Sequence, residues 1–151
     1  MRLLDRIRNK FREPADLVFA LRIGAFMWRV PKLMRPMKLE DLLDRVRDAR
    51  RTTKGDVARD IERIIRLRSP WFRLPMLAPY NTCFMRALTL YRFLDASQRD
   101  LRLHFVIEPE RSPGDRLRSH AWVTVDGEVV EEPDLRESGQ VHEIYVHVAP
   151  P

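Results

Sequence analysis

The stretch that decides the fold covers residues 82–94 and reads Thr82-Cys83-Phe84-Met85-Arg86-Ala87-Leu88-Thr89-Leu90-Tyr91-Arg92-Phe93-Leu94. Beyond its first two residues, only Arg86, Thr89 and Arg92 interrupt the apolar side chains. A helix that is apolar around most of its circumference belongs in the interior of a fold. We therefore predict a central helix here, with other elements packed around it.

The chain before this stretch predicts further helices. Apolar residues recur at helical spacing over residues 4–11, 15–29, 39–46 and 57–65. Pro14 suits the first turn of the second helix, and Pro31 is expected to end that helix. Residues 53–56 resemble a capping box for the fourth helix, and Ser69-Pro70 is expected to end it. Residues 71–81 hold prolines and predict an irregular connection.

The chain after the stretch predicts strands. Apolar residues alternate with polar ones over residues 101–107, and further strands are expected over 118–125, 128–132 and 140–148. Asp126-Gly127 is a hairpin signal between two of them. Helices followed by an antiparallel sheet predict an α+β fold of the papain or transglutaminase type, in which the central helix packs on the sheet. We expect a single domain over 1–151, with a helical lobe over 1–70 and a catalytic core over 71–151.

Composition excludes several classes of protein. The 151 residues contain one cysteine, which rules out an internal disulfide and a cysteine-rich zinc site. The 28 Lys and Arg against 22 Asp and Glu give a net charge of +6, but the two signs alternate, as in residues 41–48. Mixed charge is typical of a solvated helix face, so no nucleic-acid partner is expected. Residues 15–30 are too short to span a bilayer, no secretory signal is visible, and a cytoplasmic location is expected.

Cys83 is the candidate nucleophile. Asn81 and Thr82 are good N-cap residues, which would put Cys83 in the first turn of the central helix. The dipole and the free N–H groups of a helix start stabilise a thiolate, and they can also hold an oxyanion. The alternative for a single cysteine is burial as a small apolar residue.

A thiol nucleophile needs a base, and His120 on the expected strand 118–125 is the candidate. The base needs an acid to orient it, and the hairpin register selects that acid. A three-residue loop over 125–127 places His120 opposite Glu132, whereas a two-residue loop places Glu131 on the same face as His120. We favour Glu132 and keep Glu131 and Asp126 as alternatives.

Two further features have ordinary explanations. His104, His142 and His147 lie on expected strands, where histidines are usually polar-face residues, so we expect neither a metal nor a cofactor. Residues 71–76 could line a substrate groove, but they are better explained as a core plug under the central helix.

Three segments carry a resemblance to a known family. These are residues 81–91 with Cys-x-x-Arg-Ala-Leu from Cys83, residues 101–105, and residues 120–127 with His-Ala-Trp-Val ending in Asp-Gly. In combination they resemble the transglutaminase-like leader peptidases of lasso-peptide biosynthesis. The resemblance covers about half of the chain, from Trp71 to Glu132, and the helical half matches only in character.

The resemblance implies a papain-like cysteine protease that cuts the leader from a ribosomally made precursor peptide. The family's triad is Cys-His-Asp, so Cys83 and His120 carry over directly, and Glu132 takes the place of the aspartate. The N–H of Cys83 and the side chain of Asn81 are candidates for the oxyanion site. The implied partners are a separate leader-recognition protein and an ATP-dependent cyclase. A non-catalytic peptide-binding module and an amide transferase are the alternatives on the same fold.

Overall fold

The computed structural model describes residues 11–47, 56–94, 99–107, 119–131 and 143–148. Its α-helices are α2 (Pro14–Met34), α3 (Leu39–Arg47), α4 (Val57–Arg68) and α5 (Cys83–Phe93). Two short 3-10 helices, η1 (Trp71–Arg73) and η2 (Ala78–Tyr80), join α4 to α5. The strands are β1 (Leu101–Ile107), β2 (Ser119–Val125), β3 (Glu128–Val130) and β4 (Glu143–Val148). The expected α+β class is confirmed.

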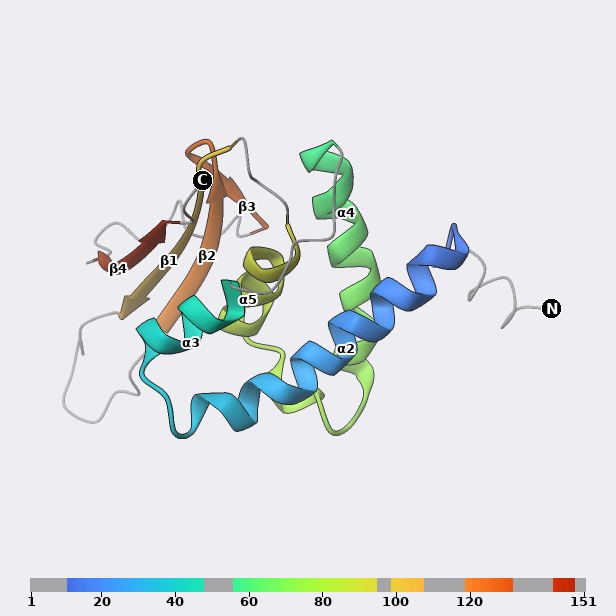
Figure 1. Cartoon of the computed structure of the whole chain (residues 1–151), viewed down its shortest axis with the longest axis horizontal. Helices are drawn as coiled ribbons and strands as arrows, with labels where there is room; N and C mark the ends of the chain where they lie inside the picture. Colours follow the sequence, from blue (N-terminus) through green and yellow to red (C-terminus); the bar gives the residue numbers. More distant parts are fainter. Residues whose placement is uncertain (1–10, 48–55, 95–98, 108–118, 132–142, 149–151) are drawn as a thin grey trace.

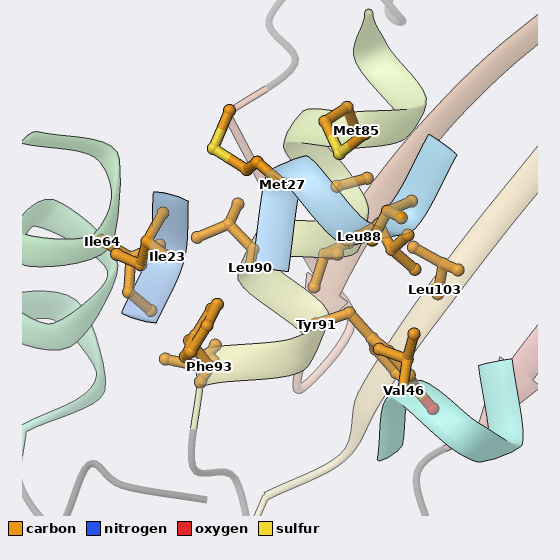
Figure 2. Packing of buried hydrophobic residues seen from close by; sticks show 14 of the residues in the cluster. Ile23, Met27, Val46, Ile64, Met85, Leu88, Leu90, Tyr91, Phe93 and Leu103 are labelled. Carbon is orange, nitrogen blue, oxygen red and sulfur yellow. The ribbon is translucent and has the colours of Figure 1, made fainter. Parts of the chain in front are cut away.

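Helix α5 is the central element, as the apolar stretch predicts. Figure 1 shows it between the sheet on one side and helices α2 and α4 on the other. Buried side chains from these elements meet around it, among them Ile23, Ile64, Leu88 and Leu103 (Figure 2). Apolar side chains of α5 contact neighbouring elements on several sides, so most of the helix surface is buried.

Helix α2 is longer than the sequence predicts. It runs through Pro31 to Met34, whereas Pro31 is expected to end it. A proline inside a helix removes one hydrogen bond to the carbonyl four residues earlier. Val30 is fully buried and Leu33 packs against the core, so the extra turn gains apolar contacts that offset this loss. The extension matters because its last turn reaches the cavity described below.

Helix α4 begins with a different cap from the expected one. Asp56 is the N-cap, and its carboxylate accepts a hydrogen bond from the N–H of Ala58. Thr53, the first residue of the expected capping box, lies outside the described residues. The end of α4 is confirmed, because Ser69 is its C-cap and Pro70 opens the next element.

The strands form an antiparallel sheet in the order β3-β2-β1-β4. Alternate residues of β1 and β2 pack on α5, including Leu103, Ala121 and Val123, each at most 1% exposed. Trp122 and Thr124 alternate with these residues and therefore lie on the opposite face of the sheet. The alternation predicted for these two strands is confirmed.

The hairpin between β2 and β3 has two loop residues, so the favoured three-residue loop is wrong. Val125 pairs with Glu128, and only Asp126 and Gly127 lie between them. Both have positive φ angles, 52° and 82°, which is the geometry of a type I′ turn. The backbone twist of a type I′ turn matches the right-handed twist of the strands that it joins. Glu132, which the longer loop would place opposite His120, lies outside the described residues.

Among the described residues, no helix has the length and apolar character needed to cross a membrane.

Candidate active site

Cys83 is the first residue of α5, as the sequence predicts. Thr82 is the N-cap, and its hydroxyl oxygen accepts a hydrogen bond of 3.2 Å from the N–H of Met85. The cap fixes the direction in which the helix starts, and the side chain of Cys83 is left half-buried at that end. The thiol therefore stands where the positive end of the helix dipole acts on it.

The sulfur of Cys83 has one described polar contact. It lies 3.5 Å from the backbone carbonyl oxygen of Ser119, the first residue of β2, and the thiol donates to that oxygen. Residues 83 and 119 come from the start of a helix and the start of a strand that pack on each other. The contact thus joins the first turn of α5 to the end of β2 that carries His120.

Cys83 and His120 line the same cavity, whose volume is about 1100 Å³. Its walls come from the end of α2, the start of α3, η2, the start of α5, and the paired strands β1 and β2. The lining residues are Pro31, Met34, Arg35, Leu39, Tyr80, Thr82, Cys83, Phe84, Met85, Phe105, Ser119 and His120. The rings of Phe84 and Phe105 meet edge to face, with 5.8 Å between their centroids. Most of the lining residues are apolar, and the thiol of Cys83 lies among them.

His120 is half-buried and is the second residue of β2. Strand alternation places it on the face that carries Trp122 and Thr124, while Ser119 is on the face packed on α5. Because His120 stands near the end of the strand, it still borders the cavity of Cys83. The two residues that the sequence singled out therefore meet at one cavity.

The first candidate for the acid that orients His120 is Asp126, and the structure gives it other partners. Asp126 lies at the other end of β2 from His120, where it binds Arg99 at 2.7 Å and the N–H of Asp100 at 3.0 Å. These two contacts, with that of Arg99 the stronger, hold the pKa of Asp126 below its usual value. Asp126 is thus a turn residue, and its place in the fold does not suit orientation of His120.

Glu131 is engaged elsewhere. It follows β3 with a positive φ of 72°, and its carboxylate pairs with the guanidinium of Arg68 at the end of α4. Glu132 lies outside the described residues and stays a prediction.

Asn81 is exposed and precedes the cap. Thr82 takes the capping role, so the two residues do not share it. Asn81 does not belong to the described lining of the cavity, whereas Thr82 and Cys83 do. A role for its side chain at an oxyanion stays a prediction.

The remaining histidines do not belong to the described lining of this cavity. His104 stacks on Trp122 with 5.1 Å between ring centroids, and its Nε2 lies 2.8 Å from the hydroxyl of Thr124. His142 lies outside the described residues, and His147 is a residue of β4. In the part of the chain that the structure describes, no group of three His, Cys, Asp or Glu is placed to hold a metal ion.

Sequence reasoning missed the contribution of the helical lobe. Met34 and Arg35 at the end of α2, with Leu39 at the start of α3, form a wall of the cavity. No local pattern marks them, because they precede Cys83 by more than forty residues. Their position depends on the continuation of α2 through Pro31, and a proline in the sequence predicts that the helix ends there.

Comparison with known proteins agrees with this architecture. No curated protein and no solved structure was found to match the chain. A family model does match, over residues 17–144, and its description is transglutaminase-like superfamily. The matched region runs from the first part of α2 to the start of β4, and it therefore includes both Cys83 and His120. The chain belongs to the transglutaminase-like superfamily.

Proposed function

We propose that this chain is a cysteine peptidase that removes the leader from a ribosomally made precursor peptide, as in lasso-peptide maturation. The observation that carries the proposal is the position of Cys83. It opens a capped helix and lines a cavity of about 1100 Å³ together with His120. The Cys-x-x-Arg-Ala-Leu and His-Ala-Trp-Val segments are the residues by which the chain resembles leader peptidases.

The proposed chemistry is acyl transfer through a thioester. The thiolate of Cys83 attacks the carbonyl carbon of the scissile peptide bond, and the N–H groups at the start of α5 stabilise the oxyanion. The C–N bond then breaks, and His120 delivers the thiol proton to the leaving amine. Water hydrolyses the thioester with His120 as base and restores the thiol. Glu132 is the proposed partner of the His120 ring.

Two alternatives use the same residues. An amide transferase would form the same thioester from a glutamine side chain, with release of ammonia, and then pass the acyl group to an amine. A binding module would hold the peptide without reacting. The first alternative has the support of the superfamily match, since transglutaminase-like domains are named after this reaction.

Cleavage of a peptide mixture tests the proposal. The full chain is incubated with an equimolar library of synthetic peptides, together with any short precursor peptide that the neighbouring genes encode, and products are identified by mass. Hydrolysis adds one water per cleavage, whereas amide transfer releases ammonia. We expect hydrolysis, which Cys83→Ala and His120→Ala each reduce by at least about 10³-fold.

Lys38→Ala is the matched control, since Lys38 is exposed and is not part of the described cavity lining. All variants are checked for a folded far-UV circular dichroism spectrum and a cooperative unfolding transition. Full activity in folded Cys83→Ala protein would exclude the proposed mechanism. Products formed with loss of ammonia would support the transferase instead.

A further inference from the structure

Exposed apolar side chains gather around the cavity of Cys83 and beyond it. Met34 and Tyr80 line that cavity and are 42% and 39% exposed. A second hollow of about 340 Å³ is lined by Trp28 and Met76, which are 43% and 62% exposed. A folded chain gains by burying such groups, so their concentration at one place marks a binding surface.

The two hollows adjoin each other. Both are lined by Pro31, Arg35 and Tyr80, which stand between them. Together they make one groove that leads from Cys83 at the start of α5, past the end of α2, to Met76 in the connection before η2. A groove of this extent accommodates several consecutive residues of a peptide.

The described lining of this groove carries positive charge and no carboxylate. Lys32 and Arg35 are its basic residues, and the ammonium of Lys32 lies 5.5 Å from the centroid of the Trp28 ring. The hollow between α2 and α4 is different, because its lining mixes Asp16 and other acids with arginines. Charges of both signs are mixed along the chain, but the described lining of the groove holds only positive ones. This local positive charge favours an acidic ligand.

We infer that this groove selects an extended peptide with bulky apolar side chains followed or preceded by an acidic residue. The apolar side chains enter the cavity beside Cys83 and cover Trp28 and Met76. The carboxylate of the peptide lies near Arg35 and Lys32. This inference rests on the proposed function, since it names the class of peptide that the same site takes.

Binding to protein that cannot react separates recognition from chemistry. Cys83→Ala protein is titrated into three fluorescein-labelled twelve-residue peptides, and anisotropy is measured. One peptide combines Leu and Phe with Glu, the second combines Leu and Phe with Lys, and the third combines Ser with Glu. We expect the first peptide to bind about fivefold more tightly than either of the others. The second peptide lacks the ion pair with the basic residues of the groove, and the third lacks the apolar side chains that the groove would bury.

Variants locate the binding in the groove. In the Cys83→Ala background, Arg35→Glu should abolish the preference for the Glu peptide over the Lys peptide, because it leaves Lys32 opposed by a carboxylate. Trp28→Ala should weaken binding of both peptides that contain Leu and Phe. Leu17→Ala is the matched control, because Leu17 is an apolar residue of α2 that is 52% exposed and outside the described lining of the groove. It should leave all three affinities unchanged.

The outcomes distinguish this inference from the proposed function. Equal binding of the three peptides, or an Arg35→Glu variant with an unaltered preference, would overturn the inference even if the wild-type protein cleaves peptides. Selective binding by the groove in a protein that cleaves nothing would support the inference and reject the peptidase.

Discussion

At the scale of single residues, the contact between Gly24 and Trp71 packs the connection before α5 against helix α2. Gly24 lies in the buried face of α2, and a Cβ built there would overlap the indole ring of Trp71. The indole of η1 therefore packs directly on the backbone of α2, which brings the connection before α5 against that helix. The expectation that residues 71–76 plug the core holds for Trp71 and Phe72, which pack against it. It is wrong for Met76, which is 62% exposed and lines the second hollow of the groove.

We expect Gly24→Ala to destabilise the protein by about 1–3 kcal/mol, because the added methyl group forces the indole of Trp71 out of its place. In an unconstrained helix the same change stabilises by about 1 kcal/mol. Urea unfolding followed by circular dichroism measures the difference.

The control for this prediction is the same change in Trp71→Ala protein. Without the indole, Gly24→Ala should be neutral or stabilising. A stabilising effect in the wild-type background would show that the indole is not held against Gly24.

At the scale of elements, α2 and α4 are joined by a buried carboxylate. Asp16 is 1% exposed and accepts hydrogen bonds from Arg63 at 2.7 Å, from Arg66 at 3.0 Å and from the N–H of Arg12 at 2.9 Å. Burial acts to raise the pKa of Asp16, but the hydrogen bond and charge of Arg63, with those of Arg12 and Arg66, together lower it. The carboxylate also lies in the first turn of α2, where the helix dipole favours it.

Asp16→Asn should cost about 3–5 kcal/mol at neutral pH, because it leaves two guanidinium groups of α4 without their carboxylate. Because the folded-state pKa of Asp16 is lowered, the ionised carboxylate stabilises the wild type at every pH above the unfolded value of about 3.9. This contribution is lost as the pH falls through the folded-state pKa. The gap between wild type and Asp16→Asn should therefore narrow in acid.

Chemical unfolding at a series of pH values between 2 and 7 measures this gap. Asp41→Asn is the matched control, since Asp41 is an exposed acid in the first turn of α3. It should change stability little at any pH. A gap for Asp16→Asn that does not depend on pH would contradict the argument.

At the scale of the whole molecule, Arg68 connects three parts of the fold. Its side chain is 2% exposed at the end of α4. One nitrogen donates to the backbone carbonyl of Arg86 in α5 at 2.9 Å, and another pairs with Glu131, which follows β3. Burial lowers the pKa of Arg68, and the charge of Glu131 opposes that effect. The guanidinium thus ties the helical lobe, the central helix and an edge of the sheet.

Arg68→Met should destabilise by about 3–5 kcal/mol, because it leaves the carboxylate of Glu131 at a partly buried place without its partner. Adding Glu131→Leu should recover much of the loss, since two apolar side chains can replace a buried ion pair. A double-mutant cycle in urea measures the coupling, and additive effects of the two changes would show that the pair is not coupled.

Several features of the fold and site could be predicted because they depend on local sequence. The period of the apolar residues identified α3, α4, α5 and the strands β1 and β2, and the N-cap signal placed Cys83 at the start of α5. The hairpin was predicted, but its register was wrong by one residue. Asp-Gly is the sequence typical of a two-residue type I′ turn, so the local pattern at Asp126 and Gly127 pointed to the register that the structure has.

The sequence by itself determined the fold class, the central helix and the candidate pair Cys83 and His120, because each depends on side-chain type and spacing along one element. Only the tertiary structure decided what surrounds that pair. Packing carried α2 past Pro31, so that Met34 and Arg35 line the same cavity as Cys83, which comes much later in the chain. Packing also engaged Glu131 with Arg68. Such contacts join residues far apart in sequence, and their free energy depends on burial, which no local pattern encodes.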